Sequence, residues 1–172
     1  MKKILFSLVA LMAVMTVQAQ SICGSWRSIQ PVVTTEQDGT VIVDNLTYTF
    51  NEDGTFSCVD EFTLSSEPAP TMALEVASNI EIKGAYVLEG DKLSLTPNVD
   101  TYKNEVLSIS MNGQVTNNPM VKGQIKSMLN SAEFKAQFAE PEENTVKVSD
   151  STLEMNNGEQ NLTLARMATI KD

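Results

Sequence analysis

The feature that most constrains the fold is a short pattern that occurs four times along the chain. In its first copy, YTFNEDGTFS from Tyr48 to Ser57, apolar and polar residues alternate, a turn rich in Asn, Asp and Gly follows, and the alternation resumes. A two-residue period is that of a β-strand buried on one face, and the turn residues tolerate positive φ angles. This copy therefore predicts a β-hairpin.

The other copies predict further hairpins that share strands. They read YVLEGDKLSLT from Tyr86, VKVSDSTLEM from Val146 and LEMNNGEQNLTL from Leu153. With strands near residues 24–30 and 106–111, about eight or nine strands are expected, the number at which an up-and-down sheet can close on itself. We predict a mainly β fold, an antiparallel up-and-down β-barrel. A two-sheet sandwich is the alternative, although it usually needs longer crossovers than these turns.

One segment, at about residues 118–139, breaks the β pattern and predicts a helical insertion. Asn118 stands where an N-cap would, Pro119 takes the first helical position, and apolar residues follow at helical spacing. Ser131 could cap a second short helix that carries Phe134 and Phe138 on one side. We expect the apolar face to pack on the outside of the barrel, with a mobile lid over the barrel mouth as the alternative.

The first nineteen residues have the pattern of a signal peptide. Lys2 and Lys3 precede an apolar run over residues 4–17, and small residues lead to Ala19. Cleavage near Ala19 would make the protein exported, to the periplasm or the outside, and would leave residues 20–172 as one barrel domain. An uncleaved membrane anchor is disfavoured because the apolar run is shorter than the roughly 20 residues of a spanning helix.

Charge and composition argue against several functions. The formal net charge is −10, which disfavours nucleic acid and anionic membrane surfaces as partners. The chain has no histidine, so the usual general base, the triads built on it and imidazole zinc ligands are missing. No phosphate-cradling glycine loop or calcium-loop pattern is present either. We therefore expect no catalysis, no metal site and no cofactor.

The chain has two cysteines, Cys23 and Cys58, so one intramolecular disulfide is possible. Such a bridge would stabilise the fold by about 3–4 kcal/mol if the geometry allowed it. Cys58 shares its strand parity with Phe56 and Phe62, which predicts an inward side chain. Cys23 has the opposite parity to Trp26, so the bridge remains an open possibility.

The stretch GSWRSI, residues 24–29, reproduces the G-x-W element that opens the first strand of the lipocalins and the wider calycin barrels. Together with the successive hairpins and the amphipathic helix, it makes the chain resemble the bacterial, exported lipocalin-like domains. In lipocalins a basic residue near the end of the barrel lies across that tryptophan. The resemblance therefore implies that Arg166 contacts Trp26 and helps to close the barrel. Arg166 shares its parity with Leu162 and Leu164, which would send it inward to a desolvated site.

Asp60 is a charged residue at a position where strand parity predicts an inward, apolar side chain. It shares its parity with Phe56, Phe62 and Leu64, which places a carboxylate among inward apolar groups. One hypothesis is that Asp60 orients the polar end of a ligand or pairs with Lys83 or Arg166. The alternative is a bulge near mid-strand that turns it to solvent. Glu140, Glu142 and Glu143 look instead like a solvated turn after the helix.

Two functions remain open. In the first, the barrel binds a small hydrophobic or amphipathic ligand. Strand parity predicts the following lining: Tyr48, Phe50, Phe56, Phe62, Ile82, Tyr86, Leu95, Ile109 and Met111. In the second, the barrel is an envelope scaffold or inhibitor that binds a protein partner through open-end loops, such as SSEPAPTM from Ser65, and through the helix. An internal cavity would favour the first function, and a filled core with an exposed apolar patch the second.

Overall fold

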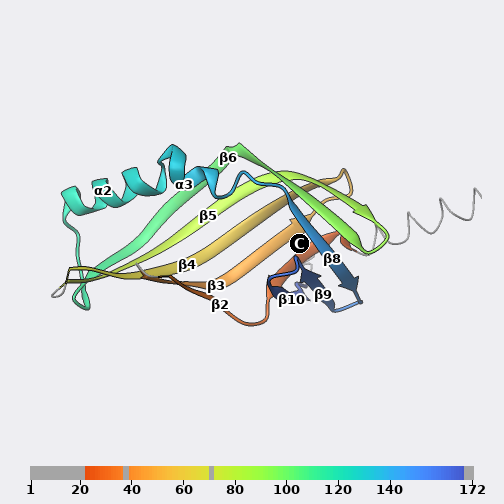
Figure 1. Ribbon diagram of the computed structural model, residues 1–172, viewed down its shortest axis with the longest axis horizontal. Helices are drawn as coiled ribbons and strands as arrows, with labels where there is room; N and C mark the ends of the chain where they lie inside the picture. Colours follow the sequence, from red (N-terminus) through yellow and green to blue (C-terminus); the bar gives the residue numbers. More distant parts are fainter. Residues whose placement is uncertain (1–21, 37–38, 70–71, 169–172) are drawn as a thin grey trace, which may run out of the picture.

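The computed structural model describes residues 22–36, 39–69 and 72–168, so the predicted signal peptide and the cleavage site at Ala19 lie outside the described residues. In chain order the elements are β1 (Gly24–Ser28), β2 (Val32–Glu36), β3 (Gly39–Phe50), β4 (Thr55–Ala69), β5 (Met72–Glu89), β6 (Lys92–Met111), β7 (Gln114–Val115), α2 (Pro119–Leu129), α3 (Ala132–Ala136), β8 (Glu142–Val148), β9 (Thr152–Asn156) and β10 (Asn161–Arg166) (Figure 1).

Eight of the strands close into a ring. The order around it is β1, β10, β9, β8, β6, β5, β4 and β3, and β1 pairs with β3 to complete the circle. Each of these pairings is antiparallel. Strand β2 extends the sheet beside β3, and β7 pairs with the end of β6. The mainly β, antiparallel closed sheet predicted from the hairpins is confirmed.

The ring occupies only one end of the longest strands. Strand β8 pairs with β6 only over Lys92 to Leu95, although β6 is 20 residues long and β5 is 18. Strands β3 to β6 therefore continue past the ring as a curved sheet, which gives the molecule its elongated shape (Figure 1). The separate strand expected over residues 106–111 is the far end of β6.

Both helices begin with the predicted caps. The Asn118 side chain accepts a hydrogen bond from the amide of Met120 at 2.9 Å, and the Ser131 hydroxyl accepts one from the amide of Phe134 at 3.1 Å. Pro119 takes the first turn of α2, where its missing N–H costs nothing. Caps and turn residues thus fix the start of each helix locally, as the sequence indicates.

The helices cover the inner face of the sheet extension, so the expectation that they pack on the outside of the barrel is wrong. Ile125 and Leu129 of α2 are buried against Phe62 and Ile109 of the sheet. Phe62 has the same strand parity as Cys58, which faces the ring interior. Because β3 to β6 outlast the ring, their inner apolar face needs another cover, and α2 and α3 supply it.

Two buried clusters result. The first fills one end of the ring around Trp26, Phe50 and Leu153, and the second lies between the sheet extension and the helices. Phe138, just after α3, packs against both clusters. Within residues 22–36, 39–69 and 72–168, no helix combines the length and apolar character needed to cross a bilayer.

Candidate ligand-binding cavity

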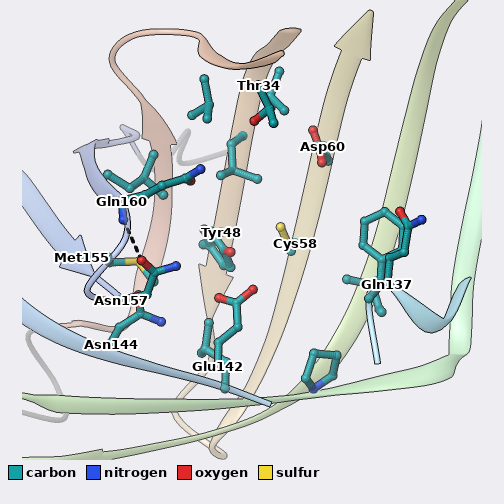
Figure 2. A pocket seen from close by; sticks show the side chains of 18 of the residues that line it. Thr34, Tyr48, Cys58, Asp60, Gln137, Glu142, Asn144, Met155, Asn157 and Gln160 are labelled. Carbon is teal, nitrogen blue, oxygen red and sulfur yellow. Dashed lines mark hydrogen bonds between the residues drawn. The ribbon is translucent and has the colours of Figure 1, made fainter. Parts of the chain in front are cut away.

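A cavity of about 590 Å³ lies where the two clusters meet. Its walls come from β2 to β6, from the segment after α3, from β8 and from the β9–β10 hairpin (Figure 2). The volume falls within the range of about 300–1,000 Å³ that is usual for small-molecule sites. The geometry thus offers room for one small ligand near the open end of the ring.

Four of the nine predicted lining residues line this cavity: Tyr48, Phe56, Ile82 and Leu95. Together with Leu46, Met155 and Leu162 they form its apolar wall. The other predicted residues lie elsewhere inside the molecule. Phe50 and Tyr86 belong to the ring cluster, Phe62 and Ile109 lie beneath the helices, and Met111 is half-buried opposite Leu74 at the far end of β6.

The ring beyond the cavity is filled by aromatic side chains. Tyr48 stacks on Phe50 with ring centroids 5.8 Å apart, and Phe50 meets Tyr86 edge-on at 5.1 Å. Phe56 packs on Gly84 of the neighbouring strand, where an added Cβ would lie 2.6 Å from the ring and 2.3 Å from the Thr96 carbonyl oxygen. The absence of a side chain at Gly84 therefore lets the aromatic cluster close one end of the barrel.

Asp60 faces the cavity from the middle of β4 (Figure 2). Its pairing partners across the sheet are Leu46 on β3 and Ile80 on β5. Burial among these apolar neighbours raises the pKa of the carboxyl to about 6. Its Oδ1 atom is buried and has no hydrogen-bond partner among the residues that the structure describes.

The pairings considered for Asp60 are not formed. The ammonium of Lys83 lies 3.3 Å from Glu81, and the guanidinium of Arg166 lies against Trp26. The bulge expected to turn Asp60 to solvent is also wrong, because the extra residue is Asp44 on the adjacent strand. Asp60 keeps its inward direction, so the hypothesis that it meets a ligand is the one that the geometry still allows.

The sequence interpretation missed the polar residues of β8. Asn144 and Val146 are buried and alternate with exposed neighbours, and Glu142 shares their strand parity although it is exposed. Glu142 and Asn144 therefore project into the cavity, where Figure 2 shows both side chains. Only 7% of Asn144 is exposed, and its Nδ2 atom has no hydrogen-bond partner in the described part of the chain. The two-residue alternation of EENTVKV was the signal that could have identified this strand.

The charged residues that line the cavity are all acidic: Asp60, Glu140 and Glu142. Two of these carboxylates, Asp60 and Glu142, influence the pKa of Cys58, which lines the same cavity. Burial is the main cause of the raised pKa of its thiol, and the negative charges of Asp60 and Glu142 raise it further. The described charged groups around the cavity are therefore of one sign, negative.

Cys23 and Cys58 do not form the disulfide that the sequence left open. In the strand register Cys58 lies opposite Tyr48, which lies opposite Trp26, whereas Cys23 precedes Trp26 by three residues. Two strand spacings and three residues along a strand separate the Cα atoms by on the order of 14 Å, beyond the roughly 7 Å that a disulfide spans. The Cys23 thiol instead lies 3.5 Å from the Tyr86 hydroxyl.

Trp26 and Arg166 make the predicted contact. They are paired across β1 and β10, and the guanidinium carbon lies 4.0 Å from the centroid of the indole ring. Arg166 also donates hydrogen bonds to the carbonyls of Cys23 and Asp150, both at 2.9 Å. Trp26 is completely buried, but Arg166 is exposed, so the expected desolvation of the arginine is wrong. The guanidinium covers the closed end of the ring from outside.

In the part of the chain that the structure describes, no three His, Cys, Asp or Glu side chains come together as a metal site. A second hollow, of about 730 Å³, lies at the irregular pairing of β5 and β6. Phe56 is the one predicted lining residue that borders it. The cavity next to Asp60 is therefore the candidate site.

Comparisons with known proteins give no family. No family model matches the chain, and no curated protein matches it. Among solved structures, the chain is similar to a lipocalin-like protein from Bacteroides uniformis, with a TM-score of 0.44, 14% identity, and coverage of 86% of this chain and 99% of that one. It is also similar to an uncharacterized protein from Bacteroides eggerthii, with a TM-score of 0.43, 16% identity, and coverage of 85% and 99%. The assignment of the fold rests on the ring of eight strands itself.

Proposed function

We propose that the protein binds one small amphipathic molecule in the cavity and holds it without catalysing a reaction. The observation that carries this proposal is the composition of the cavity wall. An apolar surface that includes Phe56, Ile82 and Leu95 is continuous with polar atoms of Asp60 and Asn144 that lack partners within the described residues. Buried polar atoms are costly when they are unpaired, so a ligand that pairs them gains affinity and orientation.

The non-catalytic part of the proposal is supported by the chemistry of the wall. Cys58 is the nucleophile within the cavity, and burial raises the pKa of its thiol, which keeps it protonated at neutral pH. The chain has no histidine to act as its base. Residues 1–19, which lie outside the described part, carry the signal-peptide pattern, and we propose that the protein acts after export.

Native mass spectrometry of the protein, purified without lipid stripping, tests the binding proposal. We expect a mass excess that belongs to one small compound and disappears on denaturation. A matched pair of variants then locates the ligand: Leu162→Trp fills the cavity, whereas Thr163→Trp, on the neighbouring position of β10, points away from it.

The mass excess should disappear in Leu162→Trp and persist in Thr163→Trp, with circular dichroism showing that both variants are folded. A bare polypeptide mass that persists after incubation with lipid extract would contradict the proposal. It would favour the alternative scaffold function, in which loops and helix bind a protein partner.

A further inference from the structure

We propose that the polar end of the ligand is a cation, a protonated amine carried on an apolar alkyl or aryl body. This inference rests on the proposed function, because it specifies what the cavity binds. Among the described residues, the charged side chains of the cavity wall are three carboxylates, with neither lysine nor arginine beside them. Glu140 and Glu142 are exposed to solvent, whereas Asp60 is half-buried. A carboxylate ligand would therefore meet like charges, and a neutral ligand would leave the Asp60 carboxylate without a counter-charge.

Within residues 22–36, 39–69 and 72–168, no lysine or arginine lines the cavity to compensate these carboxylates. In the described residues the ion pairs join Lys83 and Lys103 to Glu81, and neither reaches the cavity. Lys83 follows Ile82, which lines the cavity, so strand alternation directs Lys83 to the outer face. Lys135 lies over the ring of Tyr102, 5.3 Å from its centroid. The wall of the cavity is thus acidic and lacks a counter-ion from the described chain.

Asp60 is the strongest single determinant. Its carboxylate lies between Leu46 and Ile80, where partial burial disfavours the charged form, and one of its oxygens has no hydrogen-bond donor nearby in the described chain. An ammonium group supplies both a positive charge and N–H donors to such an oxygen. The strength of an ion pair increases when its surroundings are apolar, provided that both partners are in place.

Asn144 gives an independent reason to expect a ligand at the same place. It projects from β8, across the cavity from β4, and is 7% exposed with an unpartnered Nδ2 donor among the described residues. That donor fits an oxygen atom of the ligand, such as a hydroxyl or a carbonyl. Glu142, two residues earlier on the same face, adds a second carboxylate to the cavity wall (Figure 2). An amine that also carries an oxygen atom would pair with Asp60 on β4 and with Asn144 on β8.

Isothermal titration calorimetry with three probes of equal chain length tests this inference: octylamine, octanol and octanoate. We expect octylamine to bind at least about tenfold more tightly than octanol, because a charge-assisted hydrogen bond to a carboxylate is stronger than a neutral one. Octanoate should bind least. In Asp60→Asn the amine should lose about tenfold in affinity while octanol stays within about twofold. Asp91→Asn, which removes an equal charge from the exposed β5–β6 turn, should leave all three affinities unchanged.

The outcomes separate this inference from the proposed function. If the three probes bind to wild type with equal affinity, or if Asp60→Asn leaves the preference for the amine intact, the cation inference is overturned and the binding function stands. If none of the probes binds and native mass spectrometry shows a bare polypeptide, both are overturned. A stable fold of Asp60→Asn is checked by its thermal unfolding, so that loss of affinity is not a loss of structure.

Discussion

The two ends of the molecule enclose apolar residues in different ways. At the ring end every strand has neighbours on both sides, and the interior is filled by aromatic and aliphatic side chains beneath Trp26. At the other end β6 pairs with β5 but no longer with β8, whose pairing stops at Leu95, and α2 and α3 cover the inner face of the sheet. Two side-chain hydrogen bonds join the end of α2 to that strand: the Tyr102 hydroxyl donates to the Leu129 carbonyl at 2.9 Å, and the Asn130 amide donates to Asn104 at 3.5 Å.

This difference explains where the cavity lies. In a closed sheet the distance between opposite walls is fixed, so the walls cannot move together to close a space that side chains leave unfilled. A helix held mainly by side-chain packing can adjust its distance from the sheet. The cavity occurs at the junction, between the rigid walls of the ring and the end of α3, where neither form of packing completes the core.

The largest expected effect comes from removing a leucine side chain at each end. Leu153 in the ring and Leu129 in α2 are both fully buried. We expect Leu153→Ala to lower the free energy of unfolding by about 4 kcal/mol and Leu129→Ala by about 2–3 kcal/mol, because the helix can settle into the space whereas the ring cannot. Chemical denaturation measures both. Equal losses would show that the helix-covered end is as rigid as the ring.

A smaller loss is expected from Gly84→Ala, which sharpens the comparison at the closed end. The new Cβ would approach the Thr96 carbonyl and the Phe56 ring too closely, so we expect a loss of about 2–3 kcal/mol. Gly123→Ala in α2 is the control, since nothing lies within 4 Å of its Cβ position. It should raise stability by about 0.5–1 kcal/mol through helix propensity. If Gly84→Ala left the free energy of unfolding unchanged, the strands around residue 84 would have to shift to accommodate the new Cβ.

Removing the arginine that covers the closed end should cost less. Arg166→Ala deletes the contact with Trp26 and two hydrogen bonds to carbonyls, and we expect a loss of about 1–2 kcal/mol in thermal unfolding. Arg27→Ala, on an exposed neighbouring position of β1, should change stability by less than about 0.5 kcal/mol. If the two variants lost equal stability, Arg166 would have no special role in closing the ring.

The smallest effect concerns the junction and depends on pH. Burial raises the pKa of Asp60 from its ordinary 3.8 to about 6, so the folded protein holds this proton more tightly than the unfolded chain. The stability that protonated Asp60 gives is complete below pH ~4 and is lost as the pH rises through ~6. Asp60→Asn should therefore be more stable than wild type by about 1 kcal/mol at pH 7.5, a rise of about 2–4 °C in Tm, because cavity water screens part of the charge.

At pH 4 the two proteins should unfold at the same temperature. The other titratable residues that line the cavity, Tyr48, Cys58, Glu140 and Glu142, are common to both proteins, so the difference between the two curves isolates Asp60. If the difference in Tm between the two proteins were the same from pH 4 to pH 7.5, it would arise from packing and not from the charge of Asp60.

Local chemistry made much of this fold predictable. The turn at residues 51–54 and the caps Asn118 and Ser131 follow from residue types at fixed spacings. The contact of Trp26 with Arg166 was implied by the resemblance to the lipocalins, and the structure contains it. The length of β6 did not, because its alternation is interrupted near Pro97, where the pairing with β5 shifts between Glu81 and Lys83. The interrupted alternation therefore predicts two separate strands, although β6 continues through the interruption as one strand.

The candidate site was harder to predict than the fold. Strand parity separates inward from outward residues, but it does not tell which inward residues border empty space and which are packed. Phe50 and Phe56 have the same parity, yet only Phe56 reaches the cavity. Glu142 and Asn144 were missed because acidic residues after Pro141 resemble a solvated turn, and only their pairing with β6 shows that they face inward.

Closure of the ring depends on residues at opposite ends of the sequence. Arg166 and the Cys23 carbonyl, joined by a hydrogen bond, are 143 positions apart. While the chain is being synthesised, β1 can pair with β3 early, but its second neighbour, β10, is the last strand to be made. Until then the outer edges of β1 and β9 are open to pairing with another chain. Shortening or delaying the final strand should therefore favour self-association of the nascent protein over a monomer with a partly formed core.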